Sequence, residues 1–171
     1  MTAAWKLQIH KTIEVSAAEV IDNYLDFEHA QVLHDDGYAY TRIVHSSGNA
    51  HFVEYGVKLF FFPIKTYGWF QFVPPGRFVS HAKSLFGTTD ILVVTDVRGT
   101  RDAATIDAVY TIRPPLLLRP FMRLIEGRLR AWNAQVWEED KAMLLRRAKL
   151  LKLGFRDNHG LPEPGPTSRA G

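Results

Sequence analysis

The sequence contains no cysteine among its 171 residues. This absence excludes disulfide bonds, a thiolate nucleophile, a cysteine-ligated zinc site and an iron–sulfur cluster held by the chain's own thiolates. Long apolar runs are also missing, because no stretch approaches the ~18 uninterrupted apolar residues that a membrane span requires. The first residues lack the basic-then-apolar order of a signal peptide. We therefore expect a cytoplasmic protein with no integral membrane segment.

The sequence also lacks a strong excess of charge and the common catalytic signatures. Its formal net charge is only +3, which is too small to predict a nucleic-acid partner. No glycine-rich phosphate loop, G-x-S-x-G elbow or H-E-x-x-H pattern occurs, so the enzyme classes built on those motifs are excluded. What is present is a 46% hydrophobic chain of a length that suits one globular domain.

The first elements are predicted to be a strand and a helix. Residues 5–15 alternate in character, as a half-buried strand does. Ser16 follows, with Glu19 three residues later, and this pair is typical of a capping box at a helix start. The helix is predicted over 16–34, because turn-forming residues occupy 35–37. Its apolar face is expected to carry Val20, Tyr24 and Phe27.

The middle of the chain is predicted to form a meander of six antiparallel strands. Each run is rich in β-branched or aromatic residues and is bounded by turn residues. No helical period separates the runs, which argues against parallel crossovers. The six predicted strands cover residues 38–45, 51–62, 66–73, 77–86, 89–97 and 104–113.

A long helix is predicted after Pro114 and Pro115, ending near Leu153 with Gly154 as a plausible C-cap. We interpret its many arginines and lysines as a solvated face, although a basic amphipathic helix also suits an anionic membrane surface. Residues 155–171 are rich in proline and glycine and are predicted to form a disordered tail. The apolar stripe of the helix is predicted to contain Phe121, Ile125, Leu129, Trp132, Val136 and Met143.

This order of elements resembles the START-like, helix-grip superfamily over residues 5 to about 153. The resemblance implies an α+β fold in which a curved antiparallel sheet wraps around a long C-terminal helix. We therefore expect one START-like domain over residues 1–154. The interior of such a domain needs aromatic bulk, and most of the aromatics are best interpreted as core. The expected contributors are Phe52, Phe60, Phe62, Trp69, Phe70, Phe72, Phe78 and Phe86.

A polar constellation lies in residues 22–34, where Asn23, Asp26, His29 and His34 follow one another. The first three are spaced by three residues and share one helix face. On a straight helix His34 lies about 140° away from His29, because five residues advance five times 100°. Both imidazoles therefore reach one metal ion only if the helix breaks or bends between them.

A carboxylate on the predicted apolar stripe of the long helix, Asp140, completes this constellation. Burying a carboxylate is unfavourable unless a cation or a hydrogen-bonding partner compensates it. Two imidazoles and one carboxylate form the triad that is typical of non-haem iron(II). Two alternatives stay open: Glu138 or Glu139 is the inward residue if the helical phase differs by one, or Asp140 pairs at the surface with Lys141 or Arg147.

The run DNYLDFEHAQVLH resembles the mononuclear-iron motif in the catalytic domain of Rieske non-haem oxygenases, and WEEDKAML resembles the segment of their last helix that supplies a carboxylate. The resemblance implies that His29, His34 and Asp140 bind Fe(II). It also implies that Asp26 is the acid beside a ligand histidine and that Asn23 is the asparagine near the iron. The alternative for Asp26 is a helix-end cap or ion pair.

The chain departs from that family in one essential part. Rieske oxygenases carry an N-terminal domain in which cysteines and histidines hold a [2Fe–2S] cluster, and this sequence has neither the cysteines nor the room for one. Electrons must therefore come from an external electron donor or a reducing small molecule. Otherwise the site performs non-redox chemistry.

Three functional hypotheses follow. The first is an iron oxygenase-like enzyme that binds a hydrophobic or aromatic small molecule in an apolar pocket beside the metal. The second is a metal-free START-like carrier of a lipid or polyketide. The third is a polyketide cyclase or hydratase that uses the same pocket without redox chemistry.

Several strand residues are further candidates, but strand alternation does not fix which of them face the pocket. Three histidines are candidate acids or bases. Four basic residues are candidate anchors for an anionic substrate group, although solvation at the surface explains each of them more simply. These residues are His45, His51, His81, Arg42, Lys58, Lys65 and Arg113.

Overall fold

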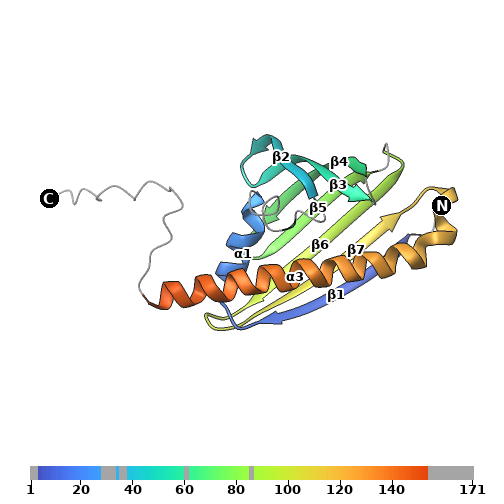
Figure 1. Cartoon of the computed structure of the whole chain (residues 1–171). Helices are drawn as coiled ribbons and strands as arrows, with labels where there is room; N and C mark the ends of the chain where they lie inside the picture. The colour runs from blue at the N-terminus through green and yellow to red at the C-terminus, as the bar shows by residue number, and fades with distance from the viewer. Residues whose placement is uncertain (1–3, 28–33, 35–37, 60–61, 85–86, 154–171) are drawn as a thin grey trace.

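The structure is a computed structural model that describes residues 4–27, 34, 38–59, 62–84 and 87–153. Seven strands and a long C-terminal helix dominate it (Figure 1). The elements are β1 (Trp5–Ile13), α1 (Ala17–Leu25), β2 (Tyr38–Ser47), β3 (Ala50–Leu59), β4 (Phe62–Val73), β5 (Arg77–Ser84), β6 (Thr89–Gly99), β7 (Ala104–Arg113), the 3-10 helix η1 (Leu116–Phe121) and α3 (Met122–Lys152).

One antiparallel sheet contains all seven strands in the order β1-β7-β6-β5-β4-β3-β2. Strands β2 to β7 form the predicted meander, and β1 returns to pair with β7 from Trp5↔Ile112 to Ile13↔Ala104. Strands β1 and β2 therefore form the two edges. Helix α3 runs across the face of this curved sheet, and α1 lies on the same side (Figure 1). The predicted α+β, helix-grip fold is confirmed.

Helix α1 begins as predicted and ends early. The Ser16 hydroxyl accepts a hydrogen bond from the Glu19 amide at 3.2 Å, and the Glu19 carboxylate accepts one from the Ser16 amide at 2.8 Å. The helix ends at Leu25, because Asp26 leaves helical geometry with φ −84° and ψ 87°. The predicted helix over 16–34 is therefore interrupted at Asp26. Phe27 is again helical, and residues 28–33 lie outside the described residues. Aspartate favours helix ends since its short side chain competes for nearby backbone groups.

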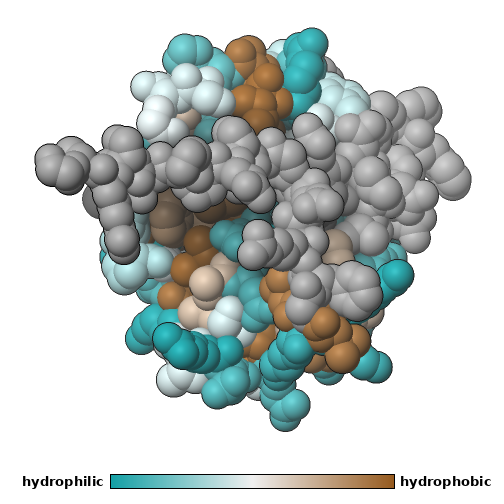
Figure 2. Space-filling model, turned by 90° about the vertical axis from the view of Figure 1, so that its left-hand side faces the viewer, coloured by the Kyte–Doolittle hydropathy of each residue, from teal (hydrophilic) through white to brown (hydrophobic). Residues whose placement is uncertain are grey.

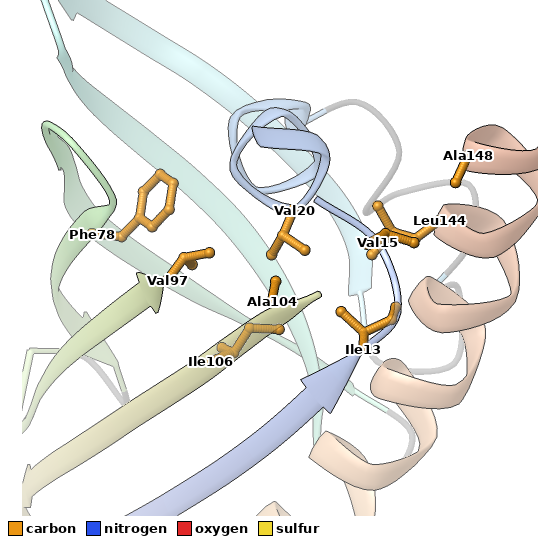
Figure 3. Close-up of a cluster of buried hydrophobic side chains, with 9 residues drawn as sticks. All are labelled: Ile13, Val15, Val20, Phe78, Val97, Ala104, Ile106, Leu144 and Ala148. Carbon is orange, nitrogen blue, oxygen red and sulfur yellow. The ribbon is translucent and has the colours of Figure 1, made fainter. Parts of the chain in front are cut away.

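The core lies where α1 is wedged between the sheet and the last third of α3 (Figure 3). Val20 reaches from α1 toward the strands, and Leu144 reaches from α3 toward Val15. Full burial of a valine or leucine side chain stabilises a fold by about 1.5–3 kcal/mol. The buried cluster consists of Ile13, Val15, Val20, Phe78, Val97, Ala104, Ile106, Leu144 and Ala148.

The regular α-helix begins at Met122, so Phe121, the first residue of the predicted apolar stripe, lies just before it. Phe121 is exposed, whereas Met122 is buried, so the prediction of an inward Phe121 is wrong. Residues 116–121 form a 3-10 turn that contains Pro120. Because proline has no amide proton to donate, the regular α-helix begins only after it. The other five residues of the predicted stripe are all partly buried.

The aromatic residues divide between the two faces of the sheet. Phe70, Phe72 and Phe78 face the helices, and Phe78 contacts both of the other rings. Trp69 lies on the opposite, outer face at 49% exposure, and Phe52 contacts its ring there. The prediction that Phe52 and Trp69 line the interior is therefore wrong, since neighbours in a strand point to opposite faces. Phe60 and Phe86 lie outside the described residues, as does the side chain of Phe62.

Figure 2 views the molecule from the end at which α3 finishes, and it shows brown hydrophobic side chains in a recess framed by teal hydrophilic ones. No helix in the described ranges combines the length and the apolarity needed to cross a bilayer. The predicted tail over 155–171 lies outside the described residues.

We predict that Leu144→Ala lowers the free energy of unfolding by about 2–5 kcal/mol, because it opens a cavity between α3 and α1. Its neighbour Leu145 is 39% exposed, so Leu145→Ala is the matched control and is expected to change the free energy by less than about 0.5 kcal/mol. Urea unfolding followed by tryptophan fluorescence measures both. Equal effects of the two substitutions would contradict this account of the core.

Candidate functional site

A buried histidine between two carboxylates is the most unusual feature of the interior. His34 is only 4% exposed. Its Nδ1 lies 2.6 Å from Oε2 of Glu139, and its Nε2 lies 3.2 Å from Oδ1 of Asp140. Both carboxylates come from consecutive positions on α3. The structure thus brings His34 and Asp140 together, and it adds Glu139 to them.

The geometry of α3 explains how both acids reach one imidazole. Consecutive residues on a helix are about 100° apart, so a ring that lies over the helix contacts both positions. The Asp140 side chain is 18% exposed and that of Glu139 is 31% exposed. Gln135 donates a hydrogen bond to Oε1 of Glu139 at 3.0 Å and holds this carboxylate in place. Glu138 is exposed and lies 4.0 Å from Lys141, so it does not take part.

The two carboxylates determine the protonation of the ring. Burial alone favours the neutral imidazole, but the hydrogen bonds and charges of Asp140 and Glu139 outweigh it and raise the pKa of His34 above 6.5. A protonated ring has a donor on each nitrogen. The His34 imidazolium therefore matches a carboxylate on either side.

A tyrosine of α1 extends this polar region toward the sheet. Tyr24 stacks on Phe78 with ring centroids 5.0 Å apart. Burial raises the pKa of the Tyr24 phenol above its ordinary value, and the charges of Tyr110 and Asp140 raise it further. Tyr24 therefore stays a neutral hydroxyl that can donate a hydrogen bond.

A second polar pair joins β7 to the middle of α3. The Tyr110 hydroxyl donates to Oδ1 of Asn133 at 2.9 Å, and Asn133 donates to the carbonyl of Leu129 at 2.9 Å. Sequence reasoning missed both residues. The alternation of side chains along a strand could have predicted the position of Tyr110, because Tyr110 follows the buried Ala108 by two residues and so points to the same inward face.

The other three residues of the sequence motif, Asn23, Asp26 and His29, differ in where the structure places them. Asn23 is buried on α1, and its Oδ1 accepts no hydrogen bond from the described part of the chain. An unsatisfied buried acceptor costs about 1–3 kcal/mol, so this oxygen suits a donor group of a bound molecule. Asp26 is partly buried but has left the helix that carries Asn23. His29 lies outside the described residues, so its role stays a prediction.

An aromatic wall lies on the same side of the sheet. Phe27 contacts Phe70 edge-on, with centroids 4.8 Å apart, and also contacts His51 at 5.4 Å. His51 is thus the strand histidine that faces inward. His81 contacts Asp90 at 3.1 Å on the outer face, where it is paired with Trp69 in the sheet register.

Three of the four candidate anchors for an anionic substrate form ion pairs within the sheet. Arg42 and Lys65 lie 3.3 and 3.2 Å from the carboxylate of Glu54, which is the register partner of Arg42 on the outer face. Arg113 lies 3.7 Å from Asp90. The side chain of Lys58 is outside the described residues. These ion pairs give three of the four basic residues a partner within the sheet.

The pair of His34 and Asp140 fits two neighbouring ligands of a metal ion. Ligand atoms about 2.0–2.2 Å from a metal and at right angles to each other are about 3 Å apart, close to the 3.2 Å between Nε2 and Oδ1. Glu139 on the opposite nitrogen matches the carboxylate that often orients a ligand histidine. Within the described ranges, however, no group of three histidine or acidic side chains assembles a metal site. The third predicted ligand, His29, is not described.

Comparison with known proteins identifies the fold. No protein-family profile matches the sequence, and no curated protein matches it. Among solved structures, the ZhuI aromatase/cyclase of Streptomyces sp. R1128 superposes with a TM-score of 0.67 at 10% identity, covering 93% of this chain and 100% of that one. Norcoclaurine synthase of Thalictrum flavum gives 0.62 at 14%, covering 79% and 92%.

Dicamba monooxygenase bound to 3,6-dichlorosalicylic acid gives a TM-score of 0.64 at 14% identity, covering 90% of this chain and 53% of that one. All three similarities rest on structure at low sequence identity. What the chain shares with these proteins is therefore the START-like, helix-grip fold.

We predict that His34 titrates with a pKa above 6.5 in the folded chain and that Glu139→Gln or Asp140→Asn lowers this pKa. Because the folded-state pKa is raised, the stabilisation from His34 is full below about pH 6.5 and is lost as the pH rises through the folded-state pKa. NMR titration of the imidazole measures the pKa directly. A ring that stays neutral below its ordinary pKa would contradict the prediction.

Proposed function

We propose that the chain is an acid–base enzyme of the cyclase or dehydratase type, acting on a hydrophobic or aromatic small molecule. The observation that carries the proposal is the buried imidazole of His34 between Glu139 and Asp140, on the side of the sheet that carries the aromatic wall. The aromatase/cyclase and synthase names of the structural neighbours support the same class of chemistry.

The proposed reaction requires only proton transfer. A carbon next to a carbonyl group loses a proton to the carboxylate of Asp140, which the His34 imidazolium holds in place. The resulting electron pair forms a bond to a second carbonyl carbon. The proton then returns to the oxygen of that second carbonyl, and subsequent loss of water forms a double bond. Atoms and electrons balance without an oxidant or a reductant. Positioned acids and bases of this kind contribute about 10²–10⁴-fold to rate.

The neighbouring side chains suit the binding of such a substrate. Phe27 and Phe70, which are only partly buried, offer apolar ring surface. Tyr24 supplies a neutral hydroxyl, and Asn23 supplies a buried carbonyl oxygen without a donor in the described part of the chain. A hydrophobic molecule that carries a few hydroxyl or carbonyl groups matches this mixture of ring surface and hydrogen-bonding groups.

Solvent deuterium exchange tests the proton transfer. We predict that the protein accelerates exchange of the methyl protons of 2-acetonaphthone, a hydrophobic ketone, and that His34→Gln reduces this acceleration by about 10²-fold or more. Proton NMR in deuterium oxide measures the rate. His81→Gln is the matched control, because His81 also contacts an aspartate but lies on the outer face. Equal rates for the wild type and His34→Gln would contradict the proposal.

A non-haem iron oxygenase is the second candidate, favoured by the 3.2 Å separation between Nε2 of His34 and Oδ1 of Asp140. In this proposal His34, Asp140 and His29 hold Fe(II), Glu139 orients His34, and Asp26 and Asn23 support the site. When bound, iron(II) supplies redox chemistry with dioxygen at its open positions. The 171 residues contain no cysteine, so electrons come from an external donor.

Elemental analysis separates the two candidates. If the chain binds iron, protein purified without chelator contains about one iron per chain, and both His34→Ala and Asp140→Ala lose it. Glu138→Ala is the control that retains the metal, because Glu138 is exposed and contacts Lys141 instead. Absence of iron after anaerobic addition of iron(II) would contradict this second candidate. Ketone exchange that survives a chelator supports the first.

A further inference from the structure

The segment that leads into α3 carries four large hydrophobic side chains that are more than half exposed. Leu116 and Leu117 are 73% and 85% exposed, and Phe121 and Leu124 are 56% and 64% exposed. Among the described residues, Leu153 is the only other large hydrophobic side chain that is more than half exposed. Four such residues within nine positions form a patch of the kind that marks an interaction site.

The backbone presents these side chains outward in a fixed way. No residue of η1 is buried, so the turn does not contribute to the core. Pro115 caps it and Pro120 lies inside it, which restricts the backbone to few conformations. Phe121 and Leu124 are three residues apart at the start of α3, so they are neighbours on one side of the helix. Leu116 and Leu117 are exposed on the 3-10 turn just before it.

The segment that carries this patch has a net positive charge. Residues 113–130 contain five arginines and a single acidic residue, Glu126. That glutamate is paired with Arg130 at 2.8 Å. Arg119 and Arg123 lie between the exposed leucines and Phe121 in sequence. Leucine and phenylalanine interleaved with arginine are typical of segments that lie in the interface of an anionic membrane.

We propose that residues 113–130 dock the protein peripherally on an anionic membrane surface. Leu117, Phe121 and Leu124 enter the boundary between headgroups and acyl chains, and Arg119 and Arg123 contact the phosphate groups. This inference does not depend on the proposed catalytic function.

A second copy of the chain is a weaker match for the same patch. A two-fold dimer brings identical patches together, so the arginines of one copy would face those of the other. Like charges set against each other oppose association. An anionic membrane surface offers an apolar layer for the leucines and Phe121 and negative charge for the arginines.

Sedimentation of the full chain with lipid vesicles tests the proposal. We predict binding to phosphatidylcholine vesicles that contain phosphatidylglycerol and little binding to vesicles of phosphatidylcholine alone. The double variant Leu117→Asp with Leu124→Asp is expected to bind anionic vesicles at least about tenfold more weakly than the wild type, because it places two charges in the apolar layer. Arg119→Gln with Arg123→Gln is expected to reduce the preference for anionic lipid.

The matched control lies at the other end of the same helix. Leu150 and Leu151 are each 40% exposed and are flanked by Lys149 and Lys152. The double variant Leu150→Asp with Leu151→Asp is expected to bind vesicles like the wild type. Circular dichroism verifies that each variant is folded.

Three results would overturn the proposal. One is the absence of vesicle binding, and another is equal binding by the wild type and the Leu117→Asp, Leu124→Asp variant. The third is a concentration-dependent dimer in gel filtration that this variant dissolves, which would assign the patch to a second copy of the chain.

Discussion

The packing of α3 against the rest of the molecule determines which part of the interior is apolar and which part is polar. Only three residues of this helix are buried: Met122 at its start, and Leu144 and Ala148 near its end. Helix α1 is wedged under the second anchor, where Val20 and Val15 meet Leu144 in the core cluster. Between the anchors the inward side chains of α3 are only partly buried. A helix fixed at two ends and spaced from the sheet by a second helix leaves its middle free for polar chemistry.

The polar groups of that middle region lie together because each of them provides a hydrogen-bonding or charged partner for another. A buried charge requires a partner, and His34 has one carboxylate at each ring nitrogen. The same helix supplies Asn133, which accepts the hydrogen bond of Tyr110 from β7. Each interaction joins α3 to another part of the chain, so the polar interior also fixes the position of the helix. The same few contacts therefore form the candidate site and hold the helix in place.

The sequence predicts most of this architecture because its patterns are local. The capping box at Ser16, the six strands of the meander and the long last helix all follow from spacing within a few residues. The errors arise where tertiary context decides. Asp26 ends α1 early, Pro120 delays the regular α-helix to Met122, and Trp69 faces outward. From the sequence, Glu139 is only an alternative to Asp140, because helical spacing does not show that one buried ring contacts two consecutive residues.

The arrangement of Glu139, His34 and Asp140 is compatible with two chemistries for a physical reason. A carboxylate on Nδ1 makes the opposite nitrogen more basic, and this strengthens its affinity for a proton and for a metal ion alike. The two uses differ in what they require beyond this site. Iron chemistry needs a third ligand and electrons from outside a chain without cysteine. Proton transfer needs only a substrate beside the pair. The aromatic wall of Phe27 and Phe70 lies on the same side of the sheet as the pair, and this is why acid–base catalysis is the function that we propose first.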